Sequence, residues 1–185
     1  MIDYWYWTDV FDKKDIKLIN KTIDSVKDLG GDIPATGAKG QRKKFVNTKR
    51  IAWPDIKSLL KNEHLHWVNA GRREFGFEVF DMDDKQVLNY NTYSAEKQQK
   101  YDWHTDYNTG NNYWNIKLTV LINLSEDNYK GGEFEIFNGD TYEVKELNKP
   151  GNIIMFKSFL NHRVKPVLSG TRKTLTIFID GPSFK

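Results

Sequence analysis

Hydrophobic and polar positions change their spacing near Phe75. Before that point, a short aromatic strand is predicted over Tyr4 to Trp7, and a helix between an N-cap at Asp12 and a stop at Gly30-Gly31. The apolar positions of this helix recur every three or four residues and are Ile16, Ile19, Ile23 and Val26. The chain is therefore expected to open with a strand and an amphipathic helix.

Two further segments complete the N-terminal part. Asp32 to Arg50 contains glycine, proline and basic residues with little periodicity, which predicts a long loop. A second helix is expected to begin around Pro54 and to end near Gly71, because proline is tolerated in the first helical turn. Its inward-facing residues are expected to be Ile56, Leu59, Leu60 and Trp67. Residues 1–75 are thus expected to form a helical support region.

From Phe75 onward, short apolar or alternating runs are separated by polar and glycine-bearing turns. The predicted strands are Phe77–Asp81, Gln86–Tyr93, Asp102–Asp106, Trp114–Leu124, Glu133–Phe137, Tyr142–Lys145, Asn152–Phe156, Arg163–Val167 and Lys173–Asp180. Many short strands at near-regular spacing predict a β-sandwich or a jelly-roll barrel. We therefore expect residues 1–185 to form a single, mainly β domain. Its barrel core spans 76–185, and the N-terminal helices pack on one sheet.

Composition narrows the class of protein. A chain of 185 residues with 38% hydrophobic and 14% aromatic residues fits one globular domain with its own core. The absence of cysteine excludes disulfides, thiolate zinc sites and cysteine nucleophiles. Met1 to Val10 lacks the basic and apolar regions of a signal peptide, and no apolar run is long enough to span a bilayer. A cytoplasmic location without membrane contact is therefore expected.

The charge pattern gives only weak information about partners. The net charge is +3, and the single basic cluster is Lys39 to Lys44. A solvated loop accounts for such a cluster more readily than a nucleic-acid site does, because nucleic-acid-binding domains usually carry a larger basic patch. Binding to nucleic acid is therefore not the expected function, although the sequence leaves it open.

The triplet His104-Thr105-Asp106 is the main candidate for chemistry. Residues two apart on a strand point to the same face, so one strand would offer an imidazole and a carboxylate to one metal ion. A His-x-Asp triplet alone arises easily by chance. The neighbouring histidines His64 and His66 lie two apart on a predicted helix and face different directions, so we interpret them as structural or surface residues.

Two later residues give this triplet its context. His162 opens a predicted strand that could lie beside His104, completing a two-histidine, one-carboxylate triad. Such a triad leaves coordination positions open and suits non-haem Fe(II). Arg172 begins the strongly alternating final strand, where a guanidinium could hold a carboxylate bidentately. Taken alone, each residue also fits a surface position.

Aromatic residues flank the predicted metal strand. They are Trp103, Tyr107, Tyr113 and Trp114. They could wall a dry pocket around a redox metal, although such residues are more often part of the core or the rim of a barrel.

Several segments together carry a family resemblance. They are Tyr101–Asp106, Leu118–Glu126, Gly131–Phe134, Pro150–Asn152, His162–Val167 and Gly170–Arg172. In this order and spacing they resemble the 2-oxoglutarate- and Fe(II)-dependent oxygenases of the prolyl-4-hydroxylase type, and the C-terminal segments are especially similar to PKHD-type hydroxylases. The resemblance covers roughly Gln86 to Asp180. It implies a double-stranded β-helix, in agreement with the strand pattern.

The resemblance also implies a role for individual residues. The implied Fe(II) ligands are His104, Asp106 and His162. Arg172 would pair with the distal carboxylate of the cosubstrate 2-oxoglutarate, Tyr93 matches a tyrosine that often hydrogen-bonds it, and Thr174 would assist from the same face. Asn123 stands where several prolyl hydroxylases have a cosubstrate-binding tyrosine. The precise hydrogen bonds to 2-oxoglutarate therefore stay open.

The activity implied by the resemblance is a dioxygenase reaction. It would use O2, Fe(II) and 2-oxoglutarate to hydroxylate a peptidyl residue, with proline as the first candidate, and would release succinate and CO2; ascorbate is a candidate reductant. One alternative is the same chemistry on a nucleobase or a small metabolite. Another is a jelly-roll binding module whose histidines are incidental.

Substrate contacts are expected from loops around the barrel mouth. These loops are Asp32–Arg50, Ser94–Lys100 and Tyr107–Tyr113. The resemblance is weakest there, so the sequence does not name the substrate. It does not determine the oligomeric state either.

Overall fold

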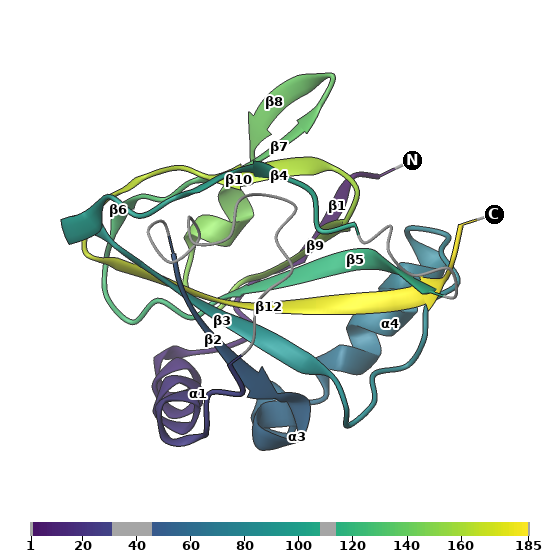
Figure 1. The fold of residues 1–185 in the computed structure, drawn as a ribbon, viewed down its shortest axis with the longest axis horizontal. Coiled ribbons are helices and arrows are strands. Elements are labelled where there is room, and N and C mark those ends of the chain that lie inside the picture. Colours follow the sequence, from purple (N-terminus) through teal and green to yellow (C-terminus); the bar gives the residue numbers. More distant parts are fainter. Residues whose placement is uncertain (1, 31–45, 108–113, 185) are drawn as a thin grey trace.

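The computed structural model describes residues 2–30, 46–107 and 114–184. Two antiparallel sheets face each other, and the helices lie against the outer face of the larger sheet (Figure 1). The prediction of a mainly β fold with N-terminal helices packed on one sheet is confirmed. None of the described helices has the length and apolar character needed to cross a membrane.

The larger sheet has six strands in the order β1-β9-β5-β12-β3-β2. Their bounds are Tyr4–Trp7 for β1, Ile153–Lys157 for β9, Trp114–Asn123 for β5, Thr171–Pro182 for β12, Val87–Ser94 for β3 and Asn47–Ala52 for β2. The smaller sheet has the order β4-β10-β7-β8, with bounds Tyr101–His104, Asn161–Val164, Phe134–Asn138 and Asp140–Glu143. A separate two-stranded sheet joins β11, Val167–Ser169, to β6, Lys130–Gly131.

The helices are short and lie mainly in the N-terminal part. The α-helices are α1, Lys13–Ser25, α3, Trp53–Ile56, and α4, Glu63–Arg73. The 3-10 turns are η1, Lys57–Leu60, η2, Ala95–Lys97, and η3, Lys145–Asn148.

Alternation along the strands divides the buried residues into two cores. In β12, Leu175 and Ile177 point toward the helices and join Ile19 and Trp67 in the larger core. The smaller core fills the space between the two sheets and includes Phe156 of β9. Residues on the opposite face of β12 from Leu175, beginning with Arg172 and Thr174, are therefore directed between the sheets.

The first predicted helix begins as expected but ends earlier. Asp12 caps α1 in a capping box with Asp15, since each side chain accepts a hydrogen bond from the other's backbone N–H. The helix ends at Ser25 and not at Gly30, because Val26 adopts an extended conformation. Leu29 then donates its backbone N–H to Arg50, so the chain is already turning along the edge of the sheet.

The loop predicted over Asp32 to Arg50 is wrong at its end, because residues 47–50 belong to β2. This edge strand carries mostly polar residues, so it shows no hydrophobic period and takes its conformation from pairing with β3. Residues 31–45, with the cluster Lys39 to Lys44, lie outside the described residues.

The second predicted helix is divided into α3, η1 and α4. Lys61 and Asn62 adopt left-handed conformations, which end the first part and start the second in a new direction. The division keeps Trp67 fully buried, as predicted, and α4 ends at Arg73, two residues beyond Gly71.

The predicted strand Phe77–Asp81 is also wrong, since these residues have no regular structure. Phe80 donates a single backbone hydrogen bond to Asp180, and the segment runs over the end of β12 without joining the ladder. The predicted strand Tyr4–Trp7 is present with the same bounds, and the other predicted strands are present with shifted ends.

Candidate functional site

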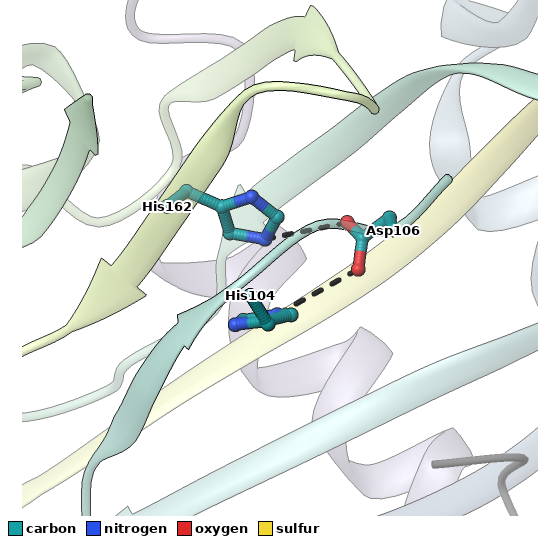
Figure 2. A group of neighbouring side chains, drawn as sticks. All are labelled: His104, Asp106 and His162. Atoms are coloured by element: carbon teal, nitrogen blue, oxygen red, sulfur yellow. Dashed lines mark ion pairs between the residues drawn. The ribbon is translucent and has the colours of Figure 1, made fainter. Parts of the chain in front are cut away.

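The predicted metal-ligand residues lie together between the two sheets. His104 and His162 occupy paired positions on β4 and β10, and their ring centroids are 4.1 Å apart. Asp106 Oδ1 lies 3.7 Å from His104 Nε2, and Asp106 Oδ2 lies 3.4 Å from His162 Nε2 (Figure 2). One ligand atom from each residue falls within 4.8 Å of the other two. This separation suits three ligands of one metal ion.

Backbone carbonyls orient both imidazoles toward the centre of the cluster. His104 Nδ1 lies 2.7 Å from the carbonyl oxygen of Asp102, and His162 Nδ1 lies 3.0 Å from that of Leu160. A carbonyl only accepts hydrogen bonds, so each Nδ1 carries the proton and each Nε2 presents its lone pair to the cluster. This arrangement is typical of histidines that bind metals.

Burial also keeps His162 in the form that binds a metal. The side chain is 4% exposed, and burial lowers the pKa of His162 to about 4. The imidazole is therefore neutral at pH 7, and its Nε2 lone pair is available to a metal ion.

Asp106 reaches the cluster by a route that strand alternation did not predict. β4 ends at His104, so Asp106 lies beyond the strand and not on it. Its backbone N–H donates to the carbonyl oxygen of Ser158 across the barrel, at 2.8 Å. The hydroxyl of Thr119 on β5 donates to Asp106 Oδ2, also at 2.8 Å. The carboxylate is therefore fixed by the larger sheet, while the two histidines come from the smaller one.

Arg172 is buried on the inner face of β12. The side chain is 1% exposed, and its Nε has no hydrogen-bond partner among the described residues. A buried guanidinium N–H without a partner is costly, and an anionic ligand would satisfy it. Gly132 makes room for the side chain, since a Cβ there would lie 2.8 Å from Arg172 Cδ. The observed packing therefore fits a built anion site.

Two other predicted cosubstrate residues, Tyr93 and Thr174, lie beside Arg172. Tyr93 is paired with Arg172 across β3 and β12, and the guanidinium carbon lies 5.3 Å from the Tyr93 ring centroid. Burial raises the pKa of Tyr93, so its hydroxyl stays protonated and can donate. Thr174 is buried two residues from Arg172, on the same face.

Asn123 pairs with Thr174 but is already engaged within the protein. Its Nδ2 donates to the Leu147 carbonyl at 2.8 Å and to the Tyr129 hydroxyl at 3.1 Å, and its Oδ1 accepts from Ser125 N–H. The side chain thus ties the end of β5 to η3, and its contact with a cosubstrate stays a prediction.

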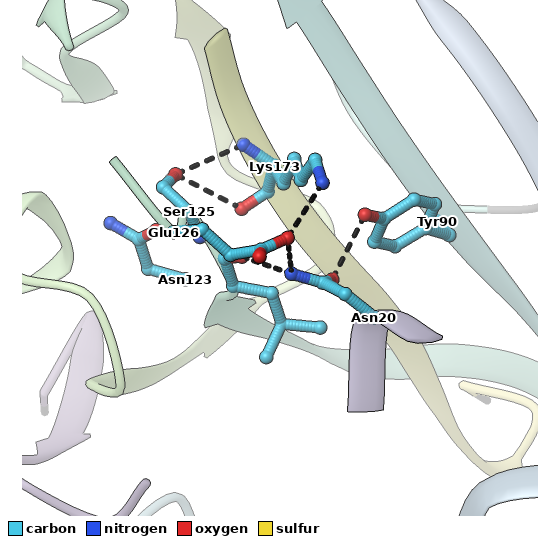
Figure 3. A network of polar contacts seen from close by, with 7 residues as sticks. Asn20, Tyr90, Asn123, Ser125, Glu126 and Lys173 are labelled. Carbon is cyan, nitrogen blue, oxygen red and sulfur yellow. Dashed lines mark hydrogen bonds and ion pairs between the residues drawn. The ribbon is translucent and has the colours of Figure 1, made fainter. Parts of the chain in front are cut away.

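A polar network under the start of β12 holds the backbone beside Arg172 (Figure 3). Lys173 N–H donates to Ser125 Oγ at 3.0 Å, and its ammonium donates to Glu126 at 2.9 Å. Buried Asn20 of α1 donates to the same carboxylate at 2.8 Å and accepts from the Tyr90 hydroxyl at 2.9 Å. The helix packed outside the sheet is thereby connected to the strand that carries Arg172.

The flanking aromatic residues have separate positions. Trp103 is 39% exposed and packs against Arg163, so it lies on the outer face of the smaller sheet and does not wall the site. Tyr107 is half-buried beside Phe184. Tyr113 lies outside the described residues, as does the side chain of Trp114. The prediction of a common aromatic wall is therefore wrong for Trp103.

His64 and His66 lie on α4 and take no part in this cluster. His64 packs edge-on against Trp53, with ring centroids 5.3 Å apart, and His66 is exposed, as expected for structural and surface residues. The functional residue that sequence reasoning missed is Thr119. Its signal was available, because Thr119 is a polar residue between the apolar residues Leu118 and Val120 of β5.

Comparisons with known proteins agree on the family and the fold. Residues 86–180 match the family described as the 2OG-Fe(II) oxygenase superfamily. No curated protein matches the chain by sequence. Among solved structures, a prolyl hydroxylase from Trichoplax adhaerens, in complex with a hypoxia inducible factor peptide fragment, is similar at 14% identity and a TM-score of 0.67 over 96% of this chain and 83% of that one.

Two further structures show the range of relatives. The viral collagen prolyl hydroxylase of Paramecium Bursaria Chlorella virus-1, as a 2OG complex, is 16% identical with a TM-score of 0.64 over 97% of both chains. The alpha ketoglutarate dependent carbocyclase SnoK from nogalamycin biosynthesis is 13% identical with a TM-score of 0.67 over 97% of this chain and 79% of that one. At these identities the likeness shows the fold, which is the double-stranded β-helix of these oxygenases.

Proposed function

Because the chain belongs to the 2OG-Fe(II) oxygenase superfamily, we propose that it is an Fe(II)- and 2-oxoglutarate-dependent dioxygenase that hydroxylates a residue of a peptide or protein. Proline is the first candidate for that residue. The observation that carries the proposal is the cluster of His104, Asp106 and His162, with the buried Arg172 on the facing sheet.

The donor set fits the metal and the cosubstrate. Two neutral imidazoles and one carboxylate leave several coordination positions open, which Fe(II) oxygenases need for the cosubstrate and O2. Arg172 would hold the distal carboxylate of 2-oxoglutarate, with Tyr93 and Thr174 beside it. When bound, Fe(II) and 2-oxoglutarate supply the oxidative decarboxylation that releases succinate and CO2 and transfers one oxygen atom to a C–H bond of the substrate.

The residues of the chain keep this site ordered and dry. The carbonyl oxygens of Asp102 and Leu160 hold the imidazole protons away from the metal, and Thr119 holds one carboxylate oxygen. His162 and Arg172 are almost fully buried, so water has little access to that side of the site. These groups need little rearrangement when the metal and the cosubstrate bind.

The choice of a peptide substrate is supported by two relatives of similar fold. One is a prolyl hydroxylase in complex with a peptide fragment, and another is a collagen prolyl hydroxylase. The similar fold of the carbocyclase SnoK supports the alternative, in which the substrate of this protein is a small metabolite.

The test is succinate formation by the purified protein with Fe(II), 2-oxoglutarate and O2, with and without a library of proline-containing peptides analysed by mass spectrometry. We expect succinate to form, and a peptide to gain the mass of one oxygen atom. His104→Ala and Asp106→Ala should each abolish both signals, whereas the exposed His66→Ala serves as the control and should retain them. Turnover that persists in both site variants would contradict the proposal. Oxidation of a metabolite without oxidation of any peptide would mean that the substrate is a small metabolite and not a peptide.

A further inference from the structure

A row of side chains on β5 runs from the anion site past the metal-ligand cluster to a buried lysine. The residues Asn123, Leu121 and Thr119 share the face opposite Leu118 and Val120. Lys117 comes next on β5, where the pairing with β12 shifts its register. Asn123 pairs with Thr174 beside the anion site, and Thr119 donates to Asp106. The carbonyl oxygen of Lys117 accepts from Ser158 N–H, and the carbonyl oxygen of Ser158 accepts from Asp106 N–H. Lys117 therefore lies beyond the metal-ligand cluster along β5, on the side away from Arg172.

Lys117 is buried without a carboxylate at ion-pair distance among the described residues. The residue is 4% exposed, and its ammonium lies 3.1 Å from the ring centroid of Phe184. Glu78 acts on the ammonium through its charge without an ion pair, and burial lowers the pKa of Lys117. A buried ammonium is normally paired, because removal from water is costly for a charge. Lys117 therefore has an unused capacity to bind an anion.

The ring of Phe184 covers the Lys117 ammonium and could move away from it. Its ring centroid lies 6.0 Å from each of the rings of Phe77, Tyr107 and Phe159. The side chain is still 47% exposed, and the backbone N–H makes one hydrogen bond, to Asn115 Oδ1 at 3.0 Å. A carboxylate that displaces the ring takes the place of the cation–π contact of Lys117, and a charge-assisted hydrogen bond to the ammonium compensates for the loss of that contact. A substrate anion could therefore displace the ring.

We propose that Lys117 determines substrate specificity by binding the carboxylate of an Asp or Glu that lies close in sequence to the oxidised residue. This inference rests on the proposed peptide hydroxylation. Lys117 and Asp106 bond to the same residue, Ser158, so a carboxylate bound at Lys117 would lie near the oxidised residue. One ammonium matches one carboxylate, whereas a phosphate is usually held by several donors, often arginines. The substrate class is thus an acidic peptide.

The experiment measures binding without turnover. Protein loaded with Mn(II) and 2-oxoglutarate under nitrogen is mixed with two random peptide pools that share a central proline. One pool has Glu at the flanking positions and the other has Gln, and the retained peptides are quantified by mass spectrometry. We expect the Glu pool to be retained about tenfold more strongly, as for one charge-assisted hydrogen bond. Lys117→Met should abolish this preference, and Lys117→Glu should shift retention to a pool flanked by Lys.

Control variants distinguish the loss of the Lys117 charge from a loss of folding of the protein. Lys57→Met removes an exposed lysine, paired with Asp84, and should keep the preference for Glu. Each variant must still bind Mn(II) and 2-oxoglutarate. If Lys117→Met is unstable, the test is whether Lys117→Glu retains the pool flanked by Lys in place of the pool flanked by Glu. Equal retention of both pools by the natural sequence, retention of neither pool, or a preference that survives in Lys117→Met overturns the inference. If peptides are hydroxylated but the pools bind equally, the proposed function stands and only the role of Lys117 is lost.

Discussion

Replacing Thr119 by valine should weaken metal binding without disturbing the fold. Valine keeps the shape of threonine and removes only the hydroxyl that donates to Asp106 Oδ2 at 2.8 Å. Thr119 is 0% exposed, so water cannot take the place of the lost donor. A hydrogen bond to a charged group contributes about 1.5–3 kcal/mol, and loss of such an orienting partner lowers metal affinity about 10- to 100-fold. We therefore expect the metal Kd to rise within that range.

The assay is anaerobic titration with Fe(II), or with Mn(II) as a stable substitute, followed by calorimetry. Thr176→Val is the matched control, because Thr176 is also buried but its hydroxyl accepts from Asn91 Nδ2 at 3.0 Å, away from the metal ligands. Thr176→Val should lower the thermal unfolding temperature and leave the metal Kd within about twofold. If Thr119→Val also stays within about twofold, or if both variants lose affinity equally, the orienting role of Thr119 is refuted.

Two further predictions concern the anion site and the pH dependence of stability. Gly132→Ala should raise the KM for 2-oxoglutarate about tenfold in the succinate assay and leave the metal Kd unchanged, because the added Cβ displaces Arg172. Gly139→Ala is the control: Gly139 has a similar positive φ, but a Cβ there would have no atom within 4 Å, so the KM should not change. Burial lowers the pKa of His162 to about 4, so below about pH 6.5 the unfolded chain binds a proton that the folded, metal-free protein does not. Stability should therefore fall as the pH drops from about 6.5 to 4, by up to about 1.4 kcal/mol per pH unit from this group. In urea unfolding, the free energy of unfolding of His162→Gln should fall less over this pH range than that of the natural protein, and an equal fall in both proteins would contradict the prediction. Asp180 has a pKa raised to about 6, so it stabilises the folded protein as the pH falls. Because both proteins contain Asp180, the test is the difference between them.

The cluster of His104, Asp106 and His162 was accessible from the sequence, but the reason given for one of its residues was incomplete. The triplet was predicted from strand alternation, which requires His104 and Asp106 to share a strand. In the structure β4 ends at His104, and Asp106 is positioned by Ser158, in the turn after β9, and by Thr119 of β5. The side chains meet because the chain crosses from one sheet toward the other at that point, which no local pattern encodes.

Residues with unusual surroundings were the hardest to interpret from sequence. Lys117 was not singled out from the sequence, and Trp103 was named as a residue that could wall a pocket, although such residues are more often part of the core or the rim. Tertiary packing buried the first under Phe184 and left the second on the outer face of the smaller sheet. Whether a side chain is buried or exposed depends on which sheet covers it, and this is set by strands that lie far apart in the sequence.

The sequence by itself predicted the class of fold and the candidate residues of the site. Hydrophobic alternation selects strands, glycine and polar turns separate them, and the residue types His104, Asp106, His162 and Arg172 limit the chemistry to a nitrogen- and oxygen-ligated metal with an anion. The tertiary structure decided which edge segment became β2, how far each strand extends and which polar groups meet. The physical reason is that local periodicity reports one exposed and one buried face, whereas strand pairing and side-chain contacts depend on residues more than a hundred positions apart, as with Asn20 and Glu126, separated by 106 positions.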